Sequence, residues 1–292
     1  MNFVKHRYIY MAISAILIIA GICFAAVKGF NLGIDFSGGT VITIQAPKFI
    51  EEEKIRNIFK KYDNTIGIQY SGENKSDIIV KSTKDFDTTQ MTEIKYALEQ
   101  ELSIDRTAIS SDSAEPTMGK EIQRKAIISI LIASALMLVY ITIRFEFLFG
   151  VAAICALIHD VLITVGFYAI FSFPVNSSLI AAVLTILGYS INATIIIFDR
   201  IREERKLQPK ATKEDIINSA VNHTIRRSIF TTVTTLLAVF TLYYVGVEAV
   251  KVLALPLIIG MVSGFWSSVF LAPNFWYIFC GGDEAKVAQN KR

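Results

Sequence analysis

Residues 8–27 read YIYMAISAILIIAGICFAAV, an apolar stretch without a single charged side chain. A helix needs about 20 such residues to cross a hydrocarbon core roughly 30 Å thick. Other stretches of the chain meet the same requirement, namely residues 126–143, 147–173, 179–198, 228–247 and 252–280. The sequence therefore predicts a polytopic α-helical membrane protein with six transmembrane helices.

The composition of the 292 residues agrees with a membrane protein and argues against several soluble classes. Apolar residues make up 53% and charged residues 19% of the chain, whereas about 25% of a typical soluble domain is charged. The net charge of +3 is too small to suggest nucleic acid as a partner. All three cysteines lie in apolar stretches, as expected of small buried side chains and not of a disulfide framework.

The basic residues predict the side of the membrane on which each connection lies. An even number of spans places both termini on one side. Lys5 and Arg7 precede the first span, eight Lys and Arg residues lie in the predicted loop 199–227, and the tail 283–292 ends in two basic residues. Because cytoplasmic loops carry an excess of Lys and Arg, we expect both termini, the loop and the tail in the cytoplasm. Within the loop, residues 199–205 are expected to form a helix end with local ion pairs, and the capping-box spacing of Thr212 and Asp215 predicts a helix behind it that lies on the bundle.

Residues 30–121 are predicted to form one domain outside the membrane, between a first segment (1–29) and the other five spans (122–282). Alternating periods predict strands over 40–45, 66–70, 78–81 and 106–111, and helices over 51–62 and 87–102. The order β-α-β-β-α-β is that of a split ferredoxin-like α+β domain. This segment has no His or Cys, and its carboxylates are scattered. We therefore expect it to contact a partner or a passing chain and not to catalyse a reaction.

Ionisable side chains inside the bilayer cost roughly 2.5–3.5 kcal/mol on insertion scales, which makes them candidates for function. His159 and Asp160 lie near the middle of the third predicted span. Asp160 could take part in moving an ion, or it could be a structural carboxylate paired with an arginine. The sequence leaves both interpretations open.

The fourth and fifth predicted spans contain the other polar groups. Tyr189 and Asn192 are three residues apart and therefore share a helix face, where they could line an ion path or simply bond a neighbouring helix. Arg226 and Arg227 open the fifth span, either as interfacial anchors or as part of such a path. The threonines that follow, including Thr231, are typical of helix packing or of a polar lining.

Several strings, in this order along the chain, are similar to one known family. They are 33–40 (GIDFSGGT, with Asp35, Gly38 and Gly39), 116–119 (PTMG), 145–146 (FE), 159–161 (HDV), 188–192 (GYSIN, with Gly188 and Tyr189) and 198–203 (FDRIRE, with Asp199 and Arg200). Together they resemble the SecD/SecF family of bacterial protein-export membrane proteins over essentially the whole chain. A single exterior domain of about 80 residues favours the SecF type, since the exterior part of SecD is larger.

The resemblance implies a bundle of the RND superfamily type, in which six spans are half of a pseudo-symmetric twelve. It also implies an accessory role in the Sec translocase, with SecD, the SecYEG channel and the SecA motor as partners. In that role the complex uses the proton gradient, or in some relatives sodium, to help pull a preprotein out of the exit side of the bacterial cell membrane. No cofactor is expected besides the transported ion.

The resemblance also implies candidate residues for ion coupling. The family commonly has an aspartate directly after the Asn of the GYSIN motif, and this chain has Ala193 there. The family arginine near the start of the fifth span is matched by Arg227. With the usual carboxylate missing, several arrangements remain open. SecD could supply the only carboxylate, Asn192 and threonines such as Thr231 could serve another ion, coupling could be weak, or Asp160 could substitute.

Two other functions remain open. The chain could be half of a small-molecule transporter of the same superfamily, although such pumps carry large exterior domains in both halves. It could also be a structural subunit that stabilises SecD without conducting an ion, as the alanine at 193 would allow. Because the sequence contains no Walker loop, HExxH or GxSxG motif, we expect no enzyme activity.

Overall fold

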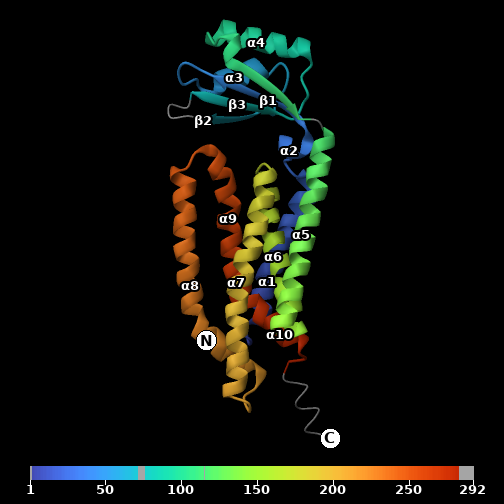
Figure 1. The fold of residues 1–292 in the computed structure, drawn as a ribbon, viewed down its shortest axis with the longest axis vertical. Coiled ribbons are helices and arrows are strands. Elements are labelled where there is room, and N and C mark those ends of the chain that lie inside the picture. Colours follow the sequence, from blue (N-terminus) through green and yellow to red (C-terminus); the bar gives the residue numbers. More distant parts are fainter. Residues whose placement is uncertain (1, 72–75, 115, 283–292) are drawn as a thin grey trace.

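The computed structural model describes residues 2–71, 76–114 and 116–282, as a bundle of long helices with a small sheet domain at one end (Figure 1). Six helices of the described chain are long and apolar enough to cross a membrane, which confirms the predicted spans. They are α1 (Arg7–Lys28), α5 (Pro116–Arg144), α6 (Phe147–Ile170), α7 (Ser177–Leu207), α8 (Lys213–Val245) and α9 (Glu248–Trp266), the last continuing through the π-helical turn η2 (Ser267–Leu271) into α10 (Ala272–Phe279).

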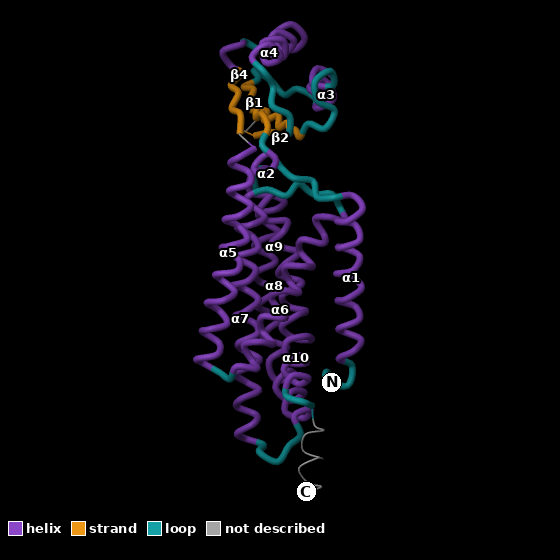
Figure 2. The backbone as a smooth tube through the Cα atoms, turned by 90° about the vertical axis from the view of Figure 1, so that its right-hand side faces the viewer, coloured by secondary structure: helices purple, strands orange, loops and turns teal. Residues whose placement is uncertain are grey.

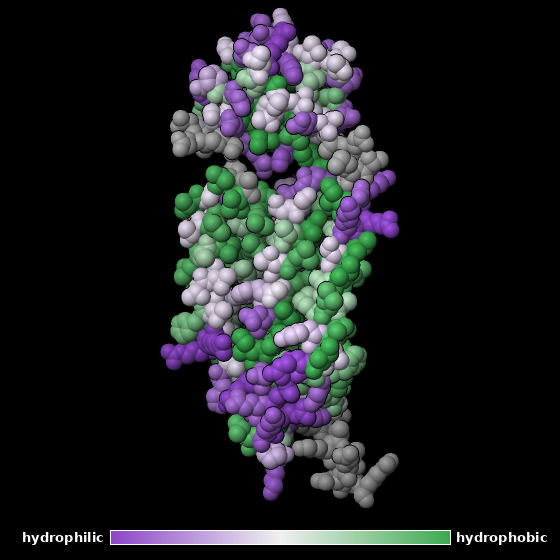
Figure 3. All heavy atoms as spheres, viewed as in Figure 1, coloured by the Kyte–Doolittle hydropathy of each residue, from purple (hydrophilic) through white to green (hydrophobic). Residues whose placement is uncertain are grey.

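The surface of the bundle matches the requirements of a bilayer. Hydrophobic residues form a belt over the middle of the molecule, between a polar sheet domain and a polar opposite end (Figure 3). Large apolar side chains of α1, α5 and α8 are exposed along this belt, among them Ile16, Leu131 and Leu237. Such exposure is costly in water and is expected where lipid covers the surface.

Small residues allow the helices of the bundle to approach closely. A Cβ atom added to Gly21 of α1 would lie 2.7 Å from the Cα atom of Gly166 in α6. A Cβ atom on Gly260 of α9 would lie 2.1 Å from the side chain of Ile186 in α7. The Gly260-xxx-Gly264 spacing therefore marks a close contact between α9 and α7, as such motifs commonly do.

The exterior domain has the predicted order of strands and helices. Its elements are α2 (Ile34–Ser37), β1 (Gly39–Gln45), α3 (Glu52–Phe59), β2 (Gly67–Ser71), β3 (Asp77–Ser82), α4 (Thr88–Leu102), η1 (Arg106–Ala108) and β4 (Ile109–Ala114). The antiparallel sheet has the order β2-β3-β1-β4, with Thr40 opposite Ser82 and also opposite Ser113. This is the ferredoxin-like topology expected from the sequence.

Alternating side chains decide which face of the sheet the two helices cover. Ile42 and Ile44 of β1 and Ile78 and Val80 of β3 are buried, and they pack with the α3 and α4 helices on the side away from the bundle (Figure 2). A capping box starts α4, because the Asp87 side chain accepts from the Gln90 amide and the Gln90 side chain accepts from the Asp87 amide.

Three predicted boundaries need correction. The last strand begins at Ile109 and not at 106, because residues 106–108 form a 3₁₀ turn that Asp105 caps. The predicted domain boundary at 121 falls inside α5, which begins at Pro116. The predicted loop 199–227 is shorter than expected, since α7 continues to Leu207 and α8 begins at Lys213, leaving only 208–212 as a connection.

The helical extension of this segment has a clear physical basis. Arg200 forms ion pairs with Glu203 and Glu204 on successive turns of α7. Thr212 caps α8 by accepting from the Asp215 amide. Beyond the cap, a stripe that includes Ile217 packs against the end of α7 and is buried, so the segment is a hairpin lying on the bundle. The predicted tail 283–292 lies outside the described residues.

Candidate functional site

A buried carboxylate lies at the centre of the bundle. Asp160 is the fourteenth of the 24 residues of α6, which places it about 20 Å along a helix with a rise of 1.5 Å per residue, in the middle of the hydrocarbon core. Its relative exposure is 0%. A charged group at this depth needs polar partners, because burial without them is strongly unfavourable.

Three serine hydroxyls donate hydrogen bonds to this carboxylate. Ser190 of α7 and Ser267 of η2 donate to Oδ2 at 2.6 and 2.7 Å, and Ser263 of α9 donates to Oδ1 at 2.7 Å. Gly264 permits this arrangement, since a Cβ atom there would lie 3.2 Å from the Cβ atom of Ser190. The cluster therefore joins three helical segments through one carboxylate, and we call Asp160, Ser190, Ser263 and Ser267 the Asp160 cluster.

The hypothesis that Asp160 pairs with an arginine is wrong. Among the described residues, the one ionisable side chain in contact with it is the neighbouring His159, whose Nδ1 atom lies 3.1 Å from Oδ1. The other ring nitrogen of His159 is buried and has no hydrogen-bond partner in the described part of the chain. The sequence pattern His-Asp therefore corresponds to a contacting pair deep in the bundle.

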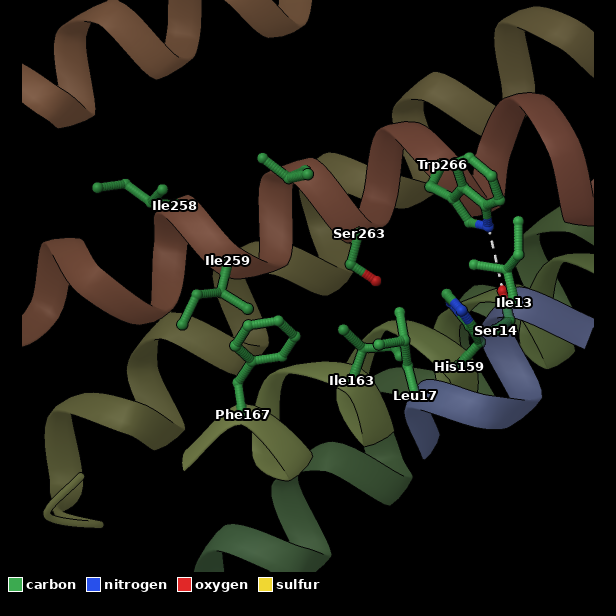
Figure 4. Close-up of a pocket in the computed structure, with 11 residues that line it drawn as sticks. Ile13, Ser14, Leu17, His159, Ile163, Phe167, Ile258, Ile259, Ser263 and Trp266 are labelled. Carbon is green, nitrogen blue, oxygen red and sulfur yellow. Dashed lines mark hydrogen bonds between the residues drawn. The ribbon is translucent and has the colours of Figure 1, made fainter. Parts of the chain in front are cut away.

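A cavity of about 370 Å³ lies beside the Asp160 cluster, between α1, α6 and α9. Its walls are mostly apolar, and the side chains of His159 and Ser263 point into it (Figure 4). On its α1 side, Ser14 accepts a hydrogen bond of 3.1 Å from the indole N–H of Trp266. The two groups that contact Oδ1 of Asp160 thus also line this cavity.

A second polar site lies in a groove between α7 and α8. Asn192, Ala193, Arg227 and Thr231, predicted as ion-coupling positions, all line it together with Tyr189. The Tyr189 hydroxyl donates to the Thr232 hydroxyl at 3.0 Å, as expected if it bonds a neighbouring helix. We call this the Arg227 groove.

Arg227 has no counter-charge in the part of the chain that the structure describes. Its side chain is exposed, and it forms neither an ion pair nor a hydrogen bond with any described residue. The neighbouring Arg226 differs, because its guanidinium lies 5.6 Å from the centre of the Phe230 ring. About 27 Å of helix separate Arg227 from the end of α8 at Val245. The arginine therefore lies at the edge of the hydrocarbon core farthest from the sheet domain.

The two polar sites do not merge. Asp160 bonds Ser190 on one side of α7, whereas Asn192 and Ala193 belong to the groove that α7 forms with α8. Asp160 and Arg227 form no ion pair. Asp160 therefore does not take the place of the missing family carboxylate as the partner of Arg227.

The GIDFSGGT segment connects the sheet domain to the bundle. Asp35 accepts a hydrogen bond of 2.8 Å from the Ser177 amide and so caps the start of α7. Gly33 donates to the carbonyl of Val175 at 2.8 Å, which ties the same segment to the α6–α7 connection. Gly119 of α5 packs on Phe36, since a Cβ atom there would lie 2.3 Å from the Phe36 carbonyl oxygen.

Two of the three glycines of the motif have positive φ angles, +73° at Gly38 and +132° at Gly39. Side chains rarely adopt these angles. By contrast, Gly188 of the GYSIN motif faces open space, with no atom within 4 Å of an added Cβ.

The FDRIRE segment forms ion pairs at the polar end of α7. Asp199 lies 3.9 Å from the Arg144 guanidinium, and Arg205 pairs with Glu146 at 2.8 Å. These two contacts hold the α5–α6 connection against α7, whereas the Arg200 pairs lie within α7. This agrees with the prediction of a helix end with local ion pairs.

Comparison with known proteins identifies the family. A family model described as protein export membrane protein SecD/SecF, C-terminal, matches residues 94–281, and one for the SecD/SecF GG motif matches residues 24–46. The protein translocase subunit SecF of Sebaldella termitidis is 36% identical over 285 residues, covering 95% of this chain and 91% of that protein. The chain belongs to the SecD/SecF family.

Solved structures of the SecD/SecF family support the same fold. A crystal structure of SecDF from Thermus thermophilus, described as a translocon-associated membrane protein, superimposes with a TM-score of 0.83 at 30% identity and 96% coverage of this chain. The chain spans only 39% of that protein and 38% of the SecDF protein of Bacillus subtilis, to which it is 32% identical. It is therefore similar to one part of these larger relatives.

Sequence reasoning missed part of the Asp160 cluster. Ser190 lies inside the GYSIN motif, but Ser263 and Ser267 belong to none of the motifs or polar positions named from the sequence. Their spacing of four residues inside an apolar stretch is the signal that could have indicated one polar helix face. Ser14 and Trp266 of the cavity offer no comparable signal.

Proposed function

We propose that this protein is an accessory subunit of the Sec protein translocase. In this proposal it lies in the bacterial cell membrane beside a SecD-type partner, with both termini in the cytoplasm. The pair uses a proton or sodium gradient to assist preprotein export through the SecYEG channel, alongside the SecA motor. The similarity to SecF over 95% of the chain is the observation that carries the translocase role.

Association with a SecD-type half is supported by the size of the larger relatives. In sequence alignments, this chain's counterpart makes up 34% of the SecDF protein of Thermus thermophilus and 38% of that of Bacillus subtilis. A separate SecD-type chain would complete the same assembly here. The exposed apolar side chains of α8, such as Val233 and Leu237, leave surface available for it.

Arg227 is our candidate for the coupling residue at that contact. It is a permanent cation at the edge of the hydrocarbon core, and no described residue neutralises it. Ala193 in the same groove cannot do so. A carboxylate from the partner's bundle would complete the pair, and reversible neutralisation of that carboxylate by a cation would make the contact sensitive to the gradient. One charge moved through 100 mV is worth about 2.3 kcal/mol, enough to bias an exterior domain between two positions.

The experiment is preprotein export into membrane vesicles that contain SecYEG, SecA, this protein and its SecD-type partner, with and without an imposed gradient. Arg227→Met should remove the gradient-dependent part of export and leave the part driven by ATP alone. The adjacent Arg226→Met is the matched control and should leave both parts intact. Equal gradient dependence in Arg227→Met and wild type would overturn the coupling role.

The choice between coupling and a purely structural role depends on the same experiment. A structural subunit predicts that both arginine variants support export equally, provided that the SecD-type partner remains present at normal levels. An immunoblot of the partner in each vesicle preparation therefore belongs to the measurement.

A further inference from the structure

The Asp160 cluster raises a question of charge balance. A carboxylate with 0% exposure lies at the middle of the hydrocarbon core. Its contacts come from three neutral hydroxyls and from His159. Within the described residues it has no Lys or Arg partner. An uncompensated charge at this depth is costly, so a cation that neutralises it stabilises the bundle.

The atoms around Asp160 suit a small hard cation. The two carboxylate oxygens and three hydroxyl oxygens lie close together, and each hydroxyl oxygen is 2.6–2.7 Å from the carboxylate oxygen to which it donates. Hydroxyls rotate freely, so each can donate to a charged carboxylate or turn a lone pair toward a cation. His159, whose Nδ1 atom lies 3.1 Å from Oδ1, is the fourth polar neighbour of the carboxylate.

The Ser267 hydroxyl has a second hydrogen-bond acceptor within reach if a cation binds to the carboxylate. The Ser267 hydroxyl lies 2.7 Å from Oδ2 of Asp160 and 3.2 Å from the carbonyl oxygen of Gly264. Its single proton can serve only one of them. When Oδ2 is charged, the hydroxyl donates to it; when a cation neutralises Oδ2, the proton can turn to the Gly264 carbonyl without loss of a hydrogen bond.

The local helix geometry agrees with a binding role. Ser267 is the first residue of the π-helical turn η2, where α9 departs from regular α-helix. Such turns are often found at functional sites, and interrupted membrane helices hold ions in several transporters. Ser268 of the same turn bonds Thr194 of α7 at 2.9 Å, so a change in η2 reaches the helix that also borders the Arg227 groove.

The cavity supplies a route of access. His159 and Ser263 both contact Oδ1 of Asp160 and both line the 370 Å³ cavity. The Nε2 atom of His159 is buried and has no partner among the described residues, and the His159 side chain lines this space (Figure 4). A cation or a water molecule in the cavity is therefore one side chain away from the carboxylate.

We propose that Asp160, Ser190, Ser263 and Ser267 form a binding site for a monovalent cation, either a proton or sodium, within this chain. A bound proton forms an O–H bond with the carboxylate, and bound sodium takes the five oxygens as ligands. The biological role of this site rests on the proposed function, since the site would be an ion site of the complex that lies inside this subunit. Binding itself is a property of the isolated chain.

The experiment uses the full-length protein in lipid nanodiscs and the fluorescence of Trp266. The chain has two tryptophans, and Trp276→Phe removes the other while keeping an aromatic ring against Phe149. The first titration exchanges choline chloride for sodium chloride at constant ionic strength. The second lowers the pH from 8 to 5 without sodium. A response to sodium alone identifies sodium, and a response to pH alone identifies the proton.

The parent protein should respond in at least one titration, and Asp160→Asn should respond in neither. If sodium is the ligand, Ser267→Ala should need a sodium concentration at least about tenfold higher, because one of the five oxygen ligands is lost. If the proton is the ligand, Ser267→Ala should respond at a proton concentration at least about tenfold lower, because the charged carboxylate loses a hydrogen bond. Thr234→Val on α8, which removes a hydroxyl bonded only to its own helix, is the matched control and should behave as the parent.

Three results would overturn the site. These are a parent that responds to neither cation, an Asp160→Asn variant that responds like the parent, and a pH response that His159→Gln removes but Asp160→Asn retains. If Asp160→Asn does not fold, Ser263→Ala and Ser267→Ala carry the test, because both keep the carboxylate. A cation response without gradient-dependent export would contradict the proposed function and leave the site intact, while the reverse would contradict only the site.

Discussion

Replacement of Gly39 by alanine should open the sheet of the exterior domain, because this glycine combines two constraints. Its φ angle is +132°, and a residue with a side chain held in a rarely populated region costs about 1–3 kcal/mol. An added Cβ atom would also lie 2.1 Å from the Ser82 carbonyl oxygen and 2.9 Å from the Cα atom of Thr83. Strand β3 would have to move away by more than 1 Å to reach an ordinary contact of about 3.4 Å.

The expected loss of local stability follows from these two terms. Separation of β1 from β3 at the Thr40–Ser82 position removes at least one hydrogen bond, worth about 0.5–1.5 kcal/mol. Together with the backbone strain, we expect a loss of about 2–4 kcal/mol. Since 1.4 kcal/mol corresponds to a factor of ten, amide exchange limited by local opening should accelerate by roughly 30-fold to several hundred-fold.

Hydrogen exchange of the full-length protein in nanodiscs measures this effect, peptide by peptide. Gly29→Ala is the matched control, because Gly29 also has a positive φ of +72° but no atom within 4 Å of an added Cβ. It should show strain alone, about 1–2 kcal/mol, confined to the end of α1. If β1 and β3 remain as protected in Gly39→Ala as in Gly29→Ala, the close approach at Ser82 does not determine this fold.

Further predictions address the exterior domain, the helix contact and the groove. Burial raises the pKa of the Asp63 carboxyl, but hydrogen bonds from Ser82 and Thr65 outweigh this effect and hold the pKa below its ordinary value. The domain should therefore lose stability as the pH falls below about 4. Asp63→Asn should remove that pH dependence and cost about 1–3 kcal/mol of stability at neutral pH, as measured by limited proteolysis between pH 7 and 3. An unchanged proteolysis profile in Asp63→Asn would contradict this. Gly260→Ala should lower the thermal unfolding midpoint by overpacking α9 on α7, at about 1–3 kcal/mol, and a shortened side chain at 186 should restore part of the loss; no rescue would point to another cause. Ala193→Asp places a carboxylate in the groove of the unpaired arginine and should weaken the gradient dependence of export, which vesicle export assays measure; an unchanged dependence would remove this position from the ion path.

The spans and the exterior topology could be predicted because their signals are local. A run of about 20 apolar residues identifies a membrane helix by itself, and alternation in β1 or the cap at Asp87 needs only a few neighbours. The helical parts of the charged connection 199–227 could be predicted from local signals as well, whereas the exact point at which each helix ends could not. Residues 199–227 are rich in charge, yet the ion pairs of Arg200 and the buried stripe around Ile217 keep them helical.

The candidate sites could be predicted only in part, because they depend on contacts between distant segments. The family resemblance implied that Arg227 lies near Asn192 and Ala193, and these residues line one groove. The partners of Asp160 lie 30, 103 and 107 residues away. No local pattern distinguishes their hydroxyls from the many serines and threonines that bond only their own helix, such as Thr234.

Cation flux through the assembled complex tests the central claim most directly. Vesicles would contain this protein and its SecD-type partner, and a fluorescent dye inside would report proton or sodium entry down an imposed gradient. The account predicts a measurable entry for wild type and for Arg226→Met, and its loss in Arg227→Met. Entry at the wild-type rate in Arg227→Met, or no entry above that of empty vesicles in wild type, would contradict it.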